Sequence, residues 1–212
     1  MKIKSVDLSN FRNIEKISFD LSHKFIIKGS NGSGKTSVLE ACNILLSGRS
    51  FRTSDIKDCI KNGKKNFFIK CSVTDFEGFL REISIGYDVS GNKRILIDGI
   101  NSSRKELLNI VFPIVHTPED MEIISGGPKS RRDFIDRICF MENREYFDDM
   151  TEYIRFIRQK NSALKKGKLK TVRYLNMAAV SVIEKIRKKR NNAIELINKK
   201  IDVISNDIIF EN

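Results

Sequence analysis

Alternation of apolar and polar residues, the pattern of a β-strand with one buried face, recurs through the first half of the chain. It predicts strands over residues 2–8, 14–21, 67–74, 79–87 and 94–97. Turns that contain glycine and asparagine separate the later strands, which should therefore form an antiparallel meander. Short apolar runs at 25–27 and 111–115 predict two further strands, and Pro118 should then end regular structure.

From residue 129 onward the apolar residues recur every three or four positions, which is typical of helices with one buried face. This spacing predicts helices over 131–140, 142–164 and 171–205, and Gly167 separates the two long ones. Two amphipathic helices joined by a short turn form an antiparallel hairpin. The sequence therefore predicts an α/β lobe with the sheet over residues 1–128 and a helical lobe over 129–212.

Residues 29–36 fit the phosphate-binding pattern G-x-x-x-x-G-K-[ST] at every required position. The predicted binding residues are Gly29, Ser30, Asn31, Gly32, Ser33, Gly34, Lys35 and Thr36. Predicted elements flank the loop as the motif requires, with the strand 25–27 before it and an amphipathic helix over 37–46 after it. The spacing of the glycines excludes the dinucleotide pattern G-x-G-x-x-G.

This motif predicts a site for a nucleoside triphosphate, which we take to be ATP. The loop backbone and the N-terminus of the helix would hold the phosphates. Lys35 would act on the β- and γ-phosphates, and the Thr36 hydroxyl would bind Mg²⁺. The chain lacks an apolar run long enough to span a membrane, and its four cysteines have no metal-binding spacing.

Charge adds a second candidate ligand. The formal net charge is +12, and residues 151–212 hold 15 of the 39 Lys and Arg but only 6 of the 27 Asp and Glu. Such a surplus favours a polyanion such as DNA, although a solvated helix surface explains it equally well. The cations expected on the exposed faces of the last helix are Lys185, Arg187, Lys188, Lys189 and Arg190.

Residues 95–98 superficially resemble a Walker B strand that ends in an aspartate. Gly99 stands where a catalytic acid belongs, and Asp98 with Gly99 is a common turn pair, so we predict a hairpin there. The sequence offers no other Walker B candidate.

Several stretches, in this order, resemble the RecF family of bacterial recombination mediators, whose heads are like those of ABC, SMC and Rad50 ATPases. They are residues 10–13, 29–36 with 39–41, 48–53, 118–120, 126–136 and 158–164. Arg-Ser-Phe-Arg-Thr in 48–53 and G-x-P-x-x-R-R-x-F-x-D in 126–136 are more specific than the phosphate loop. The match covers essentially all of this chain but only the N-terminal portion of a RecF.

The resemblance implies an α/β P-loop NTPase fold of the ABC-ATPase head type, with a mixed sheet lobe and a helical lobe. It also implies a cytoplasmic protein of DNA repair, recombination and replication restart that binds single-stranded or gapped DNA. ATP would drive formation of a homodimer, and the partners would be RecO-like and RecR-like mediators.

The resemblance gives further roles to single residues. Arg12 would approach the γ-phosphate as a catalytic residue beside Lys35. Glu119 or Asp120 would lie near Mg²⁺ and the attacking water, with helix capping as the alternative. Arg131 and Arg132 would contact DNA or, as we favour, form internal ion pairs with nearby aspartates.

The chain also departs from the family pattern. The signature serine motif and the Walker B aspartate are absent, so we expect these residues to bind ATP and barely hydrolyse it. The alternatives are an SMC or Rad50 head, a small-molecule P-loop kinase, or a nucleotide-binding module without turnover.

Overall fold

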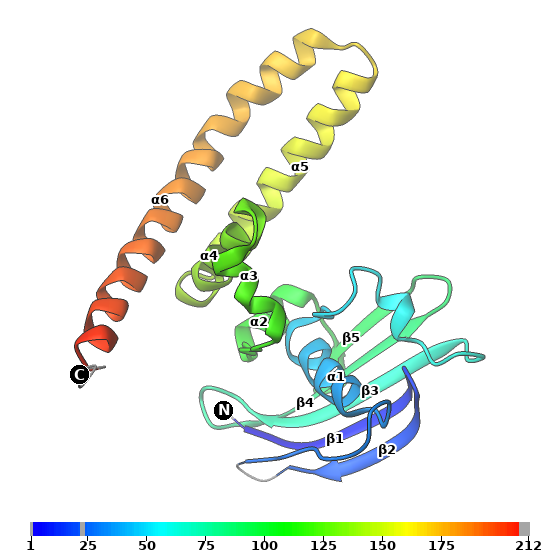
Figure 1. The fold of residues 1–212 in the computed structure, drawn as a ribbon. Coiled ribbons are helices and arrows are strands. Elements are labelled where there is room, and N and C mark those ends of the chain that lie inside the picture. The colour runs from blue at the N-terminus through cyan, green and yellow to red at the C-terminus, as the bar shows by residue number, and fades with distance from the viewer. Residues whose placement is uncertain (1, 22–23, 208–212) are drawn as a thin grey trace. The chain divides into compact units, whose positions relative to one another are not determined.

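The computed structural model describes residues 2–21 and 24–207 and divides the chain into two compact units, Met1–Val115 and His116–Asn212 (Figure 1). No helix in the described part of the chain is both long and apolar enough to cross a membrane.

The first unit is built on a six-stranded antiparallel sheet with the strand order β2-β1-β3-β4-β5-β6. The strands are β1 (Lys2–Phe11), β2 (Ile14–Asp20), β3 (Asn66–Thr74), β4 (Leu80–Asp88), β5 (Lys93–Ile97) and β6 (Ile100–Asn101). The register aligns Leu8, Ile69, Ile85 and Ile95 in one row across four strands, all buried. This row lies on the inner face of the sheet, as the alternating pattern of the sequence requires.

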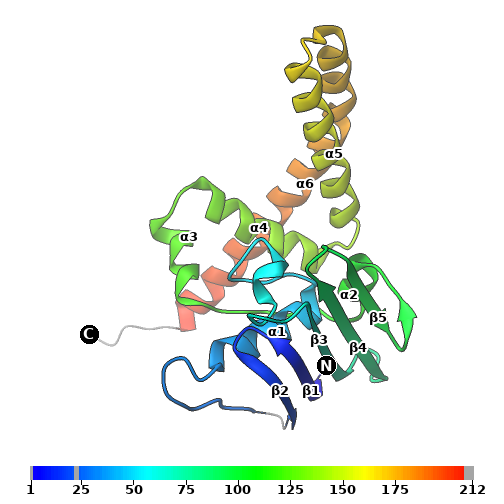
Figure 2. The same cartoon turned by 90° about the vertical axis from the view of Figure 1, so that its right-hand side faces the viewer.

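One face of the sheet is covered by α1 (Lys35–Ser47), as Figures 1 and 2 both show. Ala41, Ile44 and Leu45 of α1 are fully buried in the same core as the inner row of the sheet. A short 3₁₀ helix, η1 (Ile56–Cys59), and a helix, α2 (Arg104–Ile110), complete the unit. The two predicted strands 2–8 and 14–21, the meander, and the helix after the loop are confirmed.

Two predicted strands are wrong. Residues 25–27 form no strand, and Phe25 and Ile26 are 48% and 78% exposed. A strand needs a neighbour for its backbone groups, and no strand of the described chain pairs with this run. Residues 111–115 form no strand either. Val111 is the C-cap of α2, a helix that begins at a capping box of Ser103 and Glu106.

The second unit is helical, with η2 (Pro118–Met121), α3 (Glu122–Ser125), α4 (Pro128–Glu142), α5 (Tyr146–Lys165) and α6 (Leu169–Asp207). Pro118 starts η2, so the expectation that it ends regular structure is wrong; proline is favoured in a first turn, where its missing N–H costs nothing. The hairpin of α5 and α6 is confirmed (Figure 1). Its core includes Tyr146, Val182 and Ile186.

Candidate nucleotide-binding site

The predicted phosphate loop leads directly into the first turn of α1. Gly34 is the N-cap of that helix and has φ 98, a left-handed conformation that residues with a side chain adopt only with strain. At Gly29 a Cβ would lie 2.7 Å from Oγ of Ser33, so any side chain there would require this serine to move. The loop therefore packs tightly at Gly29 and depends on the left-handed conformation of Gly34.

Lys35, the first residue of α1, folds back over the loop. Its Nζ donates to the carbonyl oxygens of Gly29 at 2.8 Å and Ser30 at 2.7 Å. Thr36 follows in the first turn of the helix and is exposed. The ammonium group and the helix N-terminus thus lie at the same loop. These groups fit the phosphates of a nucleotide.

Asn13, in the turn between β1 and β2, holds this loop from outside. Its Nδ2 donates to the carbonyl oxygen of Gly32 at 2.8 Å, and its Oδ1 accepts from the Ser37 hydroxyl at 3.1 Å. A Cβ on Gly34 would lie 3.3 Å from the Asn13 amide. One side chain therefore fixes both the loop and the first turn of α1. The sequence pattern gave no role to Asn13.

The preceding residue, Arg12, binds a fully buried carboxylate on α1. Arg12 donates from Nη2 to Oε1 of Glu40 at 2.7 Å and from Nε to Oε2 at 2.9 Å. Its Nη1 donates to the carbonyl oxygen of Asp58 at 2.7 Å. This paired geometry is the strongest form of an arginine–carboxylate contact.

Side chains of the loop after α1 also contact the Glu40 carboxylate. The Ser50 hydroxyl donates to Oε1 at 2.5 Å, and Nη1 of Arg52 lies 3.3 Å from Oε2. The Cys59 thiol lies 3.6 Å from Oε1. The sequence reasoning missed this cluster, although a glutamate among the buried residues of an amphipathic helix was a signal that could have found it.

Charge and hydrogen bonding set the protonation of this cluster. Burial by itself raises the pKa of the Glu40 carboxyl, but the hydrogen bonds from Arg12 and Ser50 and the charges of Arg12 and Arg52 outweigh it and lower that pKa below 4.5. The hydrogen bond with Glu40 raises the pKa of the Arg12 guanidinium. Burial, with the Glu40 charge next, raises the pKa of the Cys59 thiol to about 12. Glu40 is therefore ionised and Cys59 neutral at pH 7.

Arg12 is thus occupied by protein groups in this structure, and its contact with a γ-phosphate stays a prediction. Asp98 lies in the turn between β5 and β6 with φ 51, where it accepts from the backbone N–H of Glu82 at 2.8 Å and from Arg81 at 3.0 Å. The hairpin predicted around Asp98 is confirmed, and the aspartate has a structural role there.

Asp120 of η2 accepts from the backbone N–H of Thr117 at 2.7 Å and from Arg137 at 3.0 Å. This is the capping contact that was the alternative to a role near Mg²⁺. Glu119 belongs to the same turn.

Several cations of the second unit differ from expectation. Lys189 pairs with Asp149 at 2.7 Å and Arg190 with Asp136 at 2.8 Å, so these two are internal ion pairs and the expectation that they are exposed is wrong. They face the packing side of α6, where α4 and α5 supply aspartates. The internal pairs expected for Arg131 and Arg132 with nearby aspartates are also wrong. Both side chains are exposed, and Asp136 already holds Arg190.

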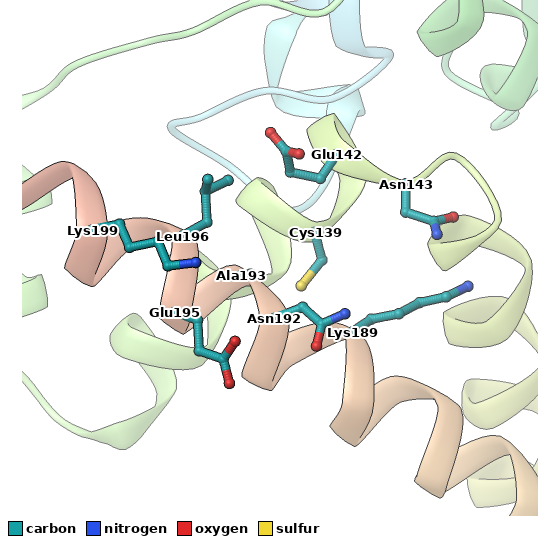
Figure 3. Close-up of a pocket in the computed structure, with 9 residues that line it drawn as sticks. All are labelled: Cys139, Glu142, Asn143, Lys189, Asn192, Ala193, Glu195, Leu196 and Lys199. Atoms are coloured by element: carbon teal, nitrogen blue, oxygen red, sulfur yellow. The ribbon is translucent and has the colours of Figure 1, made fainter.

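The second unit also has a hollow of about 380 Å³ between α4 and α6. It is lined by Cys139, Glu142, Asn143, Lys189, Asn192, Ala193, Glu195, Leu196 and Lys199. Figure 3 shows the Cys139 sulfur directed toward Asn192 on the facing helix. The charged residues of the lining have both signs, and Lys189 is already paired, so the hollow presents no converging set of groups for a ligand.

The fold and the loop together define the class of protein. An antiparallel sheet covered by a helix that begins at a glycine-rich phosphate loop, with a helical unit after it, is the head of a P-loop ATPase of the ABC type. The family model described as RecF/RecN/SMC N terminal domain matches residues 2–130, and the chain belongs to this family.

Solved structures support this assignment. The chain matches a structure described as the recombination mediator protein RecF-ATP in the RecFOR pathway with a TM-score of 0.85 and 32% identity, over 91% of this chain and 54% of that one. A structure described under ATP-driven dimerization and DNA stimulated activation of SMC ATPases matches with a TM-score of 0.54 and 25% identity. That match covers 64% of this chain and 98% of the other.

Curated relatives agree. The DNA replication and repair protein RecF of Caldanaerobacter subterraneus subsp. tengcongensis is 34% identical over 170 residues, which is 79% of this chain and 47% of that protein. The protein of the same name from an Enterobacter species is 34% identical over 195 residues, 90% of this chain and 54% of that protein. The chain spans about half the length of the curated relatives it matches. The resemblance to the N-terminal portion of RecF and the expected fold class are confirmed.

Proposed function

We propose that this chain is the nucleotide-binding head portion of a RecF-type DNA replication and repair protein, which binds ATP with Mg²⁺ and contacts single-stranded or gapped DNA. The phosphate loop carries this proposal, because its glycine backbone and Lys35 lie together at the start of α1 and Asn13 holds them from outside. A loop that is already shaped binds phosphate without first having to be ordered.

The roles of the residues follow from this arrangement. The N–H groups of the loop and the positive end of the α1 dipole hold the phosphates. Lys35 exchanges its two carbonyl partners for phosphate oxygens, and the Thr36 hydroxyl takes a place on Mg²⁺. When bound, Mg-ATP would supply the phosphate charge and the metal ion that these residues hold. We propose binding rather than turnover for these residues, because Asp98 is engaged in a hairpin and offers no Walker B carboxylate.

The relatives suggest the wider context. The RecF structure is named for the RecFOR pathway, and the SMC structure for ATP-driven dimerization. By analogy with these proteins, we propose RecO-like and RecR-like partners, an ATP-dependent homodimer and a cytoplasmic location for the protein to which these residues belong.

The test is titration of the 212-residue chain with a fluorescent ATP analogue in the presence of Mg²⁺. Lys35→Ala should weaken binding at least tenfold, because it removes the cation over the loop. Lys28→Ala is the matched control, since it removes the same charge just before the loop from an exposed side chain. Equal affinity of Lys35→Ala and the unchanged chain would overturn the proposed ATP site.

A further inference from the structure

The part of the second unit richest in unpaired charge is the tip of the α5–α6 hairpin. Between Glu152 and Glu184 the chain has no acidic residue. The same stretch holds eight cations, Arg155, Arg158, Lys160, Lys165, Lys166, Lys168, Lys170 and Arg173. Among the residues that the structure describes, none of the eight lies within 4.0 Å of a carboxylate, whereas Lys189 and Arg190 further along α6 both do.

These cations face solvent on both helices. Arg155, Arg158 and Lys165 are exposed and recur at intervals of three and seven residues, which places them on one face of α5. Lys170 and Arg173 are exposed on α6 at an interval of three. Figure 1 shows the two helices side by side up to the turn that joins them. Seven of the eight cations are thus exposed and Lys160 is half-buried, and the packed hairpin carries them on both of its helices.

We propose that this tip, defined as the eight cations between Glu152 and Glu184, binds the phosphate backbone of DNA. The inference rests on the DNA binding proposed above and assigns it to a surface. The distance from residue 155 to residue 165 along α5 is about 15 Å at 1.5 Å per residue. Duplex DNA carries about nine charges over that length. Over that length α5 itself carries four of the eight cations, and the other four follow at the turn and on α6.

An anionic membrane is the other polyanionic surface to weigh. Tyr174 and Met177 near the tip are 71% and 77% exposed. A helix that lies in a membrane interface needs a continuous apolar face. On α6, Lys170 and Arg173 lie four residues before Tyr174 and Met177, which places the cations on the same face of the helix. They therefore interrupt the apolar face. The tip therefore fits a phosphate backbone with scattered apolar contacts better than a lipid surface.

The experiment measures the affinity of the 212-residue chain for a fluorescent gapped duplex between 50 and 200 mM salt. The test variant is Arg155→Gln with Arg158→Gln and Lys165→Gln, which keeps good helix formers at exposed positions. The matched control removes the same charge from the same hairpin, outside the tip, through Lys185→Gln, Arg187→Gln and Lys188→Gln. Circular dichroism should show unchanged helix content for both triple variants.

We expect the slope of log affinity against log salt to fall in magnitude by about 2.7 in the tip variant, at about 0.9 for each lost phosphate contact. The control should change the slope by less than about 0.9, the value for a single phosphate contact. Equal slopes for the tip variant and the unchanged chain, or an equal loss in the control, would overturn the inference. So would the absence of DNA binding at 50 mM salt, or binding to phosphatidylserine vesicles alone.

Failure of the proposed function would give a different result. The loss at the tip should be the same with and without Mg-ATP, whereas Lys35→Ala should remove only the part of DNA binding that depends on the nucleotide. DNA binding that depends on the tip, in a chain that does not bind the ATP analogue, would support the tip and contradict the proposed ATP site.

Discussion

Replacing Glu40 by glutamine tests the cluster that anchors α1. The carboxylate is fully buried and accepts hydrogen bonds from Arg12 at 2.7 and 2.9 Å and from Ser50 at 2.5 Å. Glutamine has the same size but no charge, and its NH₂ group is a donor that would face the donors of Arg12. The substitution therefore leaves a guanidinium without its counter-ion and replaces an acceptor with a second donor.

The size of the effect follows from the burial of the pair. Removal of one member of a buried ion pair costs about 3–5 kcal/mol. The Arg12 side chain keeps 20% of its surface in water, so we expect the lower end, about 3 kcal/mol. Arg52, on the same carboxylate, is 44% exposed and lies at 3.3 Å, so Arg52→Gln should cost about 0.2–1 kcal/mol. The two substitutions differ because Glu40→Gln leaves Arg12 without its counter-ion, whereas after Arg52→Gln the buried Glu40 keeps its hydrogen bonds from Arg12 and Ser50.

The measurement is urea unfolding of the two variants and the unchanged chain, followed by circular dichroism at several pH values. The pKa of Glu40 is lowered in the folded state, so its stabilisation is present above the ordinary value of 4.5 and is lost as pH falls through the lowered value. The difference between the unchanged chain and Glu40→Gln should therefore be full at pH 7 and narrow in acid. A loss below about 1 kcal/mol at pH 7, or a difference that does not change with pH, would refute this reasoning.

Three further predictions concern the cysteine thiols, Tyr146 and Gly29. Burial raises the pKa of every thiol, to about 11 or 12 in the first unit, so Ellman's reagent at pH 8 should label the native chain much more slowly than the urea-unfolded chain; equal rates would contradict this. Tyr146→Phe removes the hydroxyl that donates to Asp136 at 2.6 Å and accepts from Arg190 at 3.1 Å, and should lower the free energy of unfolding by about 1.5–3 kcal/mol, as thermal melts can check. Gly29→Ala places a Cβ 2.7 Å from the Ser33 hydroxyl and should weaken ATP-analogue binding, whereas Gly63→Ala, in open space, should leave binding unchanged.

Periodicity was enough to predict most of the fold. Strands with one buried face can be recognised from the alternation of apolar and polar residues. In β3, for example, the odd-numbered residues from Phe67 to Val73 are all buried. The buried face of α6 was predictable in the same way, because its apolar residues recur every three or four positions. The apolar run 25–27 misled the prediction, because a strand depends on a neighbour and not only on its own residues. The sequence analysis missed helix α2, although Ser103 and Glu106 have the spacing of a capping box. The apolar run after this helix was interpreted as a strand instead.

The site was only half predictable. A phosphate loop is contiguous, so its motif can be recognised directly from Lys35 and the glycines. The contacts of Glu40 join residues separated by 28, 12 and 10 positions along the chain. No periodicity connects such positions, and the folded chain alone brings them together. The same holds for Lys189 and Arg190, whose aspartate partners lie on other helices 40 and 54 residues away.

The β1–β2 turn shows how these two halves of the site depend on each other. Its consecutive residues Arg12 and Asn13 hold the body of α1 through Glu40 and the phosphate loop through Gly32. Arg12 adopts φ 54, an uncommon conformation for a residue with a side chain, and so the turn is shaped around this double contact. An Arg12 side chain that turned away from Glu40 would give up two hydrogen bonds to a buried carboxylate. A contact of Arg12 with a nucleotide would therefore leave Glu40 held by the loop after α1, which carries Ser50 and Arg52.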